Sequence, residues 1–155
     1  MKNALFILLA GTIIFSNSCR KSDNLTFVER RAVGQYKFEK VTVNRDFLNT
    51  DNVTQEYNNM ILQLNDEKEA AIIDQNNGVT YLGKYDIVTQ PTANYTDDEG
   101  NTSYSDNHTI IIDIKSPGRG TSFHWVGENA TITKNKIRFK AQKSDGKYKF
   151  RLDKI

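Results

Sequence analysis

Residues 69–88 read EAAIIDQNNGVTYLGKYDIV, and this stretch decides how the chain folds. Asn77 and Gly78 separate two runs rich in apolar residues, and a type I′ turn between two strands needs two residues that accept a positive φ. A two-residue loop at this point pairs Asp74 with Tyr81 across the hairpin. The face that these two residues share carries the larger apolar and aromatic groups, so we expect it to point inward.

Short alternating runs separated by turn residues continue along the rest of the chain, and no segment sustains the period of an α-helix. The first run, residues 34–44, changes parity near Lys40, which predicts a β-bulge. A second change of parity predicts another bulge at Gly127 to Asn129. We expect eight strands, at residues 34–44, 60–64, on either side of Asn77-Gly78 within 69–88, and at 108–115, 121–133, 136–143 and 147–155.

The last hairpin is predicted from Asp145-Gly146, a second dipeptide that favours a tight turn. A two-residue loop at this point pairs Phe150 with Ala141 on the inner face. The same alternation puts Arg138 and Arg151 on the outer face. The apolar and charged residues of this hairpin therefore separate onto two faces.

Eight antiparallel strands joined in sequence can form a sandwich or a barrel. The bulges, and the lack of any strand with the features of a protected edge, favour closure because a closed barrel has no unpaired row of backbone groups. We therefore predict an all-β domain over residues 34–155, an eight-stranded antiparallel up-and-down barrel that is closed or nearly closed. The last strand then pairs with the first, and the rings of Tyr36 and Phe150 are enclosed.

Two longer polar stretches join these strands. Residues 45–59 are rich in Asn, Asp and Thr and predict a loop whose apolar side chains fold back on the domain. Residues 89–107 also predict a polar loop, which at this length is functional, mobile, or a small hairpin folded about Glu99-Gly100. The sequence leaves these alternatives open.

The N-terminal residues have the features of an export signal. A short positive start precedes the apolar run ALFILLAGTIIF at residues 4–15, which has the length of a signal peptide and is too short to span a bilayer comfortably. Cys19, the only cysteine, follows this run closely, and the small residue Ser18 precedes it. This arrangement resembles a bacterial lipoprotein signal, which implies that residues 1–18 are removed and that Cys19 is lipidated. A plain secretory signal with cleavage nearby is the alternative.

Residues 19–33 carry the lipidated cysteine and a polar, charged stretch that predicts a tether between lipid and barrel. A short helix or an N-terminal plug beneath the barrel is the alternative for residues 25–31. With a single cysteine no internal disulfide can form, so the domain depends on its hydrophobic core.

Composition and motifs argue against several classes of function. The net charge is only +2 and charges of both signs are interspersed, which does not favour a nucleic-acid surface. His108 and His124 lie on different predicted strands with no third ligand, and the acidic run at residues 97–99 does not match an EF-hand. No Gly-x-Ser-x-Gly motif is present. We expect no metal, no cofactor, no nucleic acid and no enzymatic activity.

Three short motifs carry a family likeness. The predicted barrel opens with GQYKF at residues 34–38, repeats GKY at 83–85 after the Asn-Gly turn, and closes with YKFRL at 148–152. These motifs resemble the lipocalin-like domain of bacterial lipoproteins. Lipocalins begin their first strand with Gly-x-Trp, and Tyr36 stands in the place of that Trp. The resemblance implies an eight-stranded barrel that can hold a small apolar ligand.

The candidate ligand site lies at one end of the predicted barrel, where the loops at 45–59, 77–78, 116–120 and 145–146 meet. Lipocalins leave this end open. Inward residues near it, with two lid residues from the first loop, combine apolar walls with one carboxylate and several phenols, which suits a small amphipathic ligand. The alternative is that aromatic side chains fill the interior, because eight strands enclose only a narrow space. The candidate ligand-binding residues are Phe47, Tyr57, Met60, Asp74, Tyr81, Phe123 and Tyr148.

The sequence supports two hypotheses of function. The first is a membrane-anchored, monomeric, lipocalin-like lipoprotein at the outer membrane of the bacterial cell envelope, which binds a small apolar or amphipathic ligand non-covalently. The alternative is a filled β-barrel that serves as a structural or protein-interaction module of the envelope and contacts its partner through residues 89–107. In both, the lipid on Cys19 connects the chain to the membrane.

Overall fold

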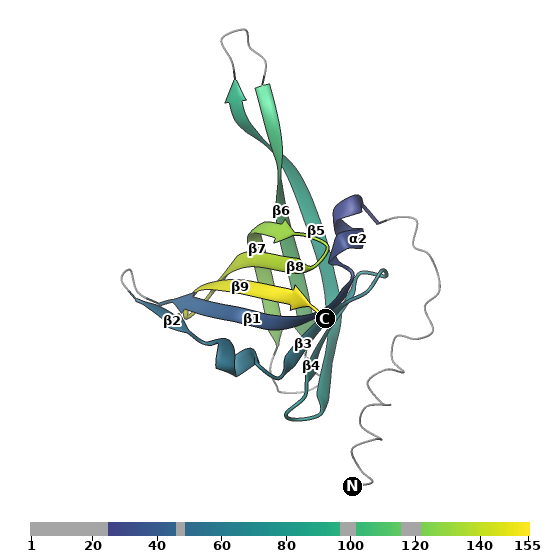
Figure 1. Cartoon of the computed structure of the whole chain (residues 1–155), viewed down its shortest axis with the longest axis vertical. Helices are drawn as coiled ribbons and strands as arrows, with labels where there is room; N and C mark the ends of the chain where they lie inside the picture. The colour runs from purple at the N-terminus through teal and green to yellow at the C-terminus, as the bar shows by residue number, and fades with distance from the viewer. Residues whose placement is uncertain (1–24, 46–48, 97–101, 116–121) are drawn as a thin grey trace.

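Closure of one antiparallel sheet organises the structure, a computed structural model that describes residues 25–45, 49–96, 102–115 and 122–155 (Figure 1). Its strands hydrogen-bond in the order β2-β1-β3-β4-β5-β6-β7-β8-β9, and a further pairing of β1 with β9 closes the barrel. The predicted all-β, eight-stranded antiparallel up-and-down barrel is therefore confirmed. The additional strand, β2, is short and pairs with the end of β1.

The bounds of the described elements agree closely with the expected runs, apart from a longer β5 and β6. The strands are β1 (Gly34–Asn44), β2 (Thr50–Asn52), β3 (Met60–Leu64), β4 (Glu69–Asp74), β5 (Val79–Thr96), β6 (Thr102–Lys115), β7 (Phe123–Ile132), β8 (Lys136–Lys143) and β9 (Gly146–Lys154). The described helices are α2 (Phe27–Ala32) and the 3-10 turn η1 (Thr54–Tyr57).

The bulge predicted near Lys40 lies at the seam where β1 meets β9. Phe38 pairs with Leu152 and Lys40 pairs with Arg151, so one residue of β1 is left over between the two pairs. The extra residue keeps the apolar side chains on both sides of the bulge inside the barrel, and it bends the strand as closure requires. The predicted bulge after Gly127 is also present, since the β7–β8 register shifts in this region.

The register of the β4–β5 hairpin corrects the prediction by two residues. Asp74 pairs with Val79 rather than with Tyr81, so the loop has four residues instead of two. The Asp74 carboxylate accepts hydrogen bonds from the backbone N–H of Asn76 at 2.9 Å and from the side-chain amide of Asn77 at 2.7 Å. This side-chain cap stabilises the longer loop. Because the shift is even, every side chain keeps its predicted face.

The β8–β9 hairpin also differs from the prediction by two residues. Phe150 pairs with Phe139 rather than with Ala141, and Gly146 belongs to β9 instead of the turn. Gly146 has a φ of +152°, and a Cβ at this position would lie 2.7 Å from the backbone oxygen of Asn44 on β1. Glycine is therefore needed here for the approach of β9 to β1, and not for the turn.

The polar stretch at residues 89–107 continues the barrel strands instead of forming a separate loop. The pairing of β5 with β6 extends to Thr96 and Thr102, and Figure 1 shows this ribbon projecting beyond the barrel. Pro91 is tolerated because β5 at this point pairs with β6 alone among the described strands. The hairpin alternative is thus the correct one, and its tip lies outside the described residues.

Helix α2 occupies part of the stretch predicted as a tether. A capping box begins it: the Glu29 N–H donates to the Thr26 hydroxyl at 3.3 Å, and the Thr26 N–H donates to the Glu29 carboxylate at 2.6 Å. Ala32 is fully buried, and the Tyr36 hydroxyl donates to its backbone oxygen at 3.0 Å. The short helix that was the alternative for residues 25–31 is therefore present and packs on the barrel.

Lys68 ties α2 to the barrel wall. From the β3–β4 turn its ammonium lies 2.7 Å from the Glu29 carboxylate and 2.8 Å from the Asp86 carboxylate on β5. Burial raises the pKa of Glu29, but hydrogen bonds from Lys68 and Thr26 outweigh it and leave that pKa below its usual 4.5. The bonds to Asp86 and Glu29 raise the pKa of Lys68 to about 12. The buried carboxylate is thus held in its charged form.

Replacing Glu29 with Gln removes this charge but keeps an acceptor for the helix cap. We expect the free energy of unfolding at neutral pH to fall by about 1–2 kcal/mol, because Lys68 is exposed enough for water to screen part of the pair. A lowered folded-state pKa adds stability above the unfolded pKa, and that stability is lost as the pH falls through the folded pKa. The difference between wild type and Glu29→Gln should therefore shrink toward zero in acid, measured by urea unfolding.

Asp86→Asn is the matched control for this experiment, because Asp86 binds the same ammonium from an exposed position. We expect a clearly smaller loss of stability from this variant. An equal loss from both variants would contradict the view that the buried carboxylate is the anchor.

Gly83 allows β6 to approach β5 closely. It pairs with Ile114, and a Cβ on Gly83 would collide with the backbone oxygen of Asp113 and lie 2.6 Å from the Cα of Ile114. We expect Gly83→Ala to lower the free energy of unfolding by about 2–3 kcal/mol, because backbone atoms of β6 must move. Urea unfolding followed by the fluorescence of Trp125, the single tryptophan, measures this loss.

Gly78→Ala provides the comparison within the same hairpin. Gly78 has a φ of +64°, but nothing lies within 4 Å of an added Cβ, so only the backbone conformation opposes the change. We expect a cost of about 1 kcal/mol. If Gly78→Ala proved as costly as Gly83→Ala, the collision with β6 would not be the cause.

Candidate functional site

Tyr57, which the sequence predicts as a lid residue, contacts the aromatic rings of the barrel interior. It ends η1, and its ring lies 5.1 Å from the ring of Phe38 and 5.8 Å from that of Phe150 between centroids. Only 7% of Tyr57 is exposed. Phe47, the other expected lid residue, lies outside the described residues. Tyr57, the described residue of the expected lid, therefore packs against the rings of Phe38 and Phe150.

Tyr81, Phe123 and Met60, three further predicted residues, pack in or against the apolar core. The ring centroids of Tyr81 and Phe123 are 5.6 Å apart, and the Phe123 ring continues to Trp125 at 5.5 Å. Met60 and Tyr81 are partly buried and pack against the core. The structure thus brings Tyr81 and Phe123 into contact, and Met60 packs against the same core.

Two polar members of the predicted set, Asp74 and Tyr148, form hydrogen bonds within their own turns. The Asp74 carboxylate caps the β4–β5 loop as described above. The Tyr148 hydroxyl donates to the carboxylate of Asp145 at 2.6 Å, and this bond, with burial as the larger cause, raises the pKa of Tyr148. The predicted polar contacts of these two groups to a ligand would therefore have to replace bonds that stabilise turns.

Aromatic rings from four strands meet across the interior. The ring of Phe150 on β9 lies 4.8 Å from Phe139 on β8, 4.9 Å from Trp125 on β7 and 6.3 Å from Phe38 on β1. All four side chains are at most 5% exposed. One of these pairs is stacked, one is tilted and one is edge-on, and such arrangements contribute beyond the burial of area. At this level the protein's own side chains occupy the barrel.

Lys143 places an ammonium group among these rings. Its Nζ donates to the Tyr57 hydroxyl at 3.1 Å and lies 4.2 Å above the ring of Tyr148 and 5.6 Å from that of Trp125. Burial lowers the pKa of Lys143, and the charges of Asp145 and Glu56 oppose this effect. No described carboxylate lies within 4 Å of this nitrogen, so cation–π contacts take the place of an ion pair.

The histidines do not form a site in the part of the chain that the structure describes. His124 Nδ1 lies 3.6 Å from the Asp113 carboxylate, and His108 Nδ1 lies 3.0 Å from the Thr89 hydroxyl. Among the described residues, no group of three His, Cys, Asp or Glu side chains could hold a metal. None of the described helices has the length and apolar character to cross a bilayer. Cys19 lies outside the described residues, and its lipidation stays a prediction.

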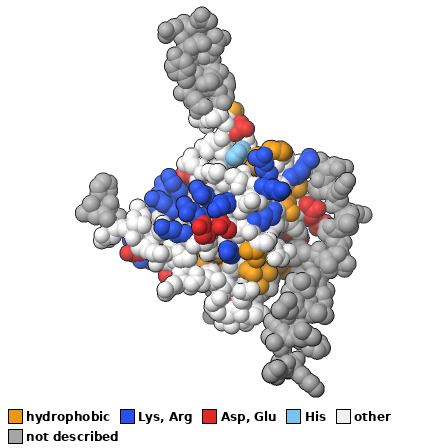
Figure 2. Space-filling model, viewed as in Figure 1, with side chains coloured by type: hydrophobic (Ala, Val, Ile, Leu, Met, Phe, Trp, Pro, Cys, Tyr) orange, Lys and Arg blue, Asp and Glu red, His pale blue; other side chains and the backbone are white. Residues whose placement is uncertain are grey.

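A hollow on the outer wall was not predicted from the sequence. It has a volume of about 490 Å³ and lies over β1, β8 and β9, and we call it the cationic hollow after the five basic side chains that line it. Lysine and arginine side chains gather on this face in Figure 2. The small net charge of the whole chain gives no indication of this cluster. The alternation of basic residues in KIRFKAQK (136–143) and KYKFRLDK (147–154) is the sequence signal that could have predicted it. The basic lining residues are Lys40, Arg138, Lys140, Lys149 and Arg151.

No family model, curated protein or solved structure matches this chain. The fold and the side-chain geometry described above therefore carry the functional argument.

Proposed function

We propose that this chain is a binding module of the bacterial cell envelope, a lipid-anchored β-barrel that engages its partner from the outer surface. The observation that carries the proposal is the contact of Phe38, Trp125, Phe139 and Phe150 across the interior. The interior of an eight-stranded barrel is only just wide enough for its own side chains. Because these four rings occupy it, little space is left for a carried ligand. The lipid on Cys19 would hold the module at the membrane.

The β5–β6 arm, residues 89–96 and 102–107, is the surface that we assign to a protein partner. Among the described strands, β4 pairs with β5 as far as Lys84 and β7 pairs with β6 from His108 onward. The Tyr85 N–H still donates to the Lys68 backbone oxygen at 2.9 Å, and along the arm the described register pairs β5 with β6 and with no third strand. An extended segment of a partner protein can add to the edge of such a two-stranded ribbon.

A second candidate function is the transport or storage of a small anionic amphiphile, and Lys143 favours it. Its ammonium lies beneath the lid residue Tyr57 and has no ion-pair partner within 4 Å in the described part of the chain. A fatty-acid carboxylate could supply that partner if Tyr57 moved aside.

Binding of a fluorescent apolar probe separates the two candidates. For a filled barrel we expect no saturable binding by the wild-type chain and new binding by Trp125→Ala, because removal of the indole leaves an apolar cavity. Tyr57→Ala, which opens only the lid, is the milder second variant if Trp125→Ala does not fold. Stoichiometric binding by the wild type, displaced by a fatty acid and lost in Lys143→Met, would reject the filled module and support the amphiphile carrier.

The role of the arm is tested by replacing residues 91–106 with an Asn-Gly turn. We expect the shortened chain to keep the urea unfolding midpoint of the wild type within a small margin, because the arm projects beyond the barrel core (Figure 1). In cross-linking on intact cells we expect the wild type to yield a defined protein adduct and the shortened chain to lose it. An adduct that persists at the same level would place the partner contact elsewhere on the barrel.

A further inference from the structure

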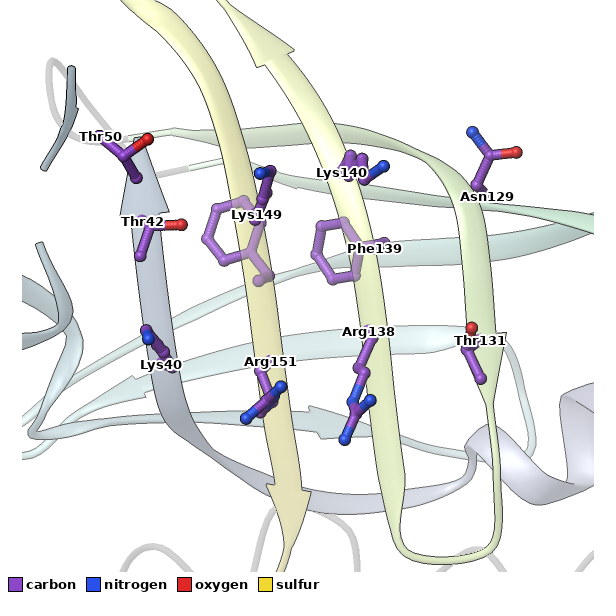
Figure 3. A pocket seen from close by; sticks show the side chains of 11 residues that line it. Lys40, Thr42, Thr50, Asn129, Thr131, Arg138, Phe139, Lys140, Lys149 and Arg151 are labelled. Atoms are coloured by element: carbon purple, nitrogen blue, oxygen red, sulfur yellow. The ribbon is translucent and has the colours of Figure 1, made fainter. Parts of the chain in front are cut away.

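The strand register arranges the basic residues of the cationic hollow in two rows across the sheet. In the first row, Arg151 on β9 pairs with Lys40 on β1 and with Arg138 on β8. In the second, Lys149 on β9 pairs with Lys140 on β8. Neighbouring strands are about 5 Å apart, so the stems of these side chains stand side by side. Figure 3 shows them on the outer side of the three strands.

Repulsion between these like charges opposes folding unless carboxylates or a bound anion neutralise them. Like charges directly opposite one another on neighbouring strands are destabilising. Among the described residues, no carboxylate lies within 4 Å of the charged groups of Lys40, Arg138, Lys140 or Lys149, and Arg151 has only Glu39 at 3.6 Å. The cluster is therefore largely unpaired within the described chain.

Carboxylates nearby do not enter the hollow. Asp153 pairs with Lys136 at 3.4 Å at its margin. Glu128 on β7 stands opposite Lys140 in the strand register but makes no ion pair with it within 4 Å. No acidic side chain is among the residues that line the hollow. The charged side chains that line the hollow are therefore all basic.

The remaining residues that line the hollow are better suited to binding oxyanions than to binding nucleic-acid bases or apolar molecules. Thr42, Thr131 and Asn129 add hydroxyl and amide donors at the rim. The rings of Phe139 and Phe150 turn to the barrel interior and are only 3% and 2% exposed. The lining therefore offers no exposed aromatic ring on which a nucleic-acid base could stack.

We propose that the cationic hollow is a binding site for clustered phosphate groups, such as those of a diphosphate or of a phosphorylated headgroup. The two arginine guanidiniums match phosphate oxygens with paired donors, and the three lysines add positive charge from neighbouring strands that stand about 5 Å apart. A volume of about 490 Å³ accommodates more than one phosphate group. This site is separate from the interior and from the β5–β6 arm, so it does not depend on the function proposed above.

Titration calorimetry of the full chain with inorganic tripolyphosphate at low ionic strength tests this proposal. We expect saturable binding that weakens as salt is added. Arg138→Gln with Arg151→Gln should lower the affinity by about a hundredfold, roughly tenfold for each charged hydrogen-bonding group. Lys84→Gln with Lys115→Gln removes the same charge from β5 and β6 and should leave the affinity unchanged. Equal affinities of the two double variants, or no binding by the wild type, would overturn the proposal.

Vesicles identify the source of the phosphate. The Cys19→Ser chain, which cannot be lipidated, is sedimented with phosphatidylcholine vesicles with and without phosphatidic acid. Binding that requires phosphatidic acid and both arginines supports a lipid headgroup, whereas binding of tripolyphosphate without such sedimentation supports a soluble phosphate compound. Tighter binding of a single-stranded oligonucleotide than of tripolyphosphate at equal charge would overturn the proposal in favour of nucleic acid.

Discussion

The pairing of β9 with β1 is the constraint on which the rest of the structure depends. It joins the first and last strands of the barrel and turns an open sheet with two edges into a closed wall. Two local features make it fit: the bulge before Lys40 bends β1, and Gly146 lets the backbone of β9 approach Asn44. Because each of the eight barrel strands then has two neighbours, the apolar alternation of each of them points to one common interior.

That closure also determines where this molecule can bind anything. The interior is narrow, and rings from β1, β7, β8 and β9 meet inside it. Alternate residues of the same strands must point outward, and on β8 and β9 most of them are basic. β8 and β9 therefore contribute aromatic rings to the core from their inner face and basic side chains to the cationic hollow from their outer face. Both faces result from the same strand register.

Much of the fold follows from patterns that the sequence displays directly. Alternation predicted the strands, and changes of parity predicted the bulges of β1 and β7. The two hairpin registers were wrong by two residues for local reasons: the side chain of Asp74 caps a longer loop, and Gly146 serves the seam instead of the turn. The cationic hollow was missed because it depends on which residues stand opposite each other, a property of the closed sheet and not of net charge. The sequence predicts Tyr57 as a lid residue, but its contact with Phe38 depends on the path of η1, which the sequence pattern does not reveal.

The meander order has a consequence for how the molecule forms. Most strands pair with a strand close by in sequence, and these contacts can form early and locally. The seam alone brings Tyr36 together with Lys154, at opposite ends of the domain. A chain emerging during synthesis therefore cannot close its barrel until β9 is free, and until then β1 offers an unprotected edge to other chains.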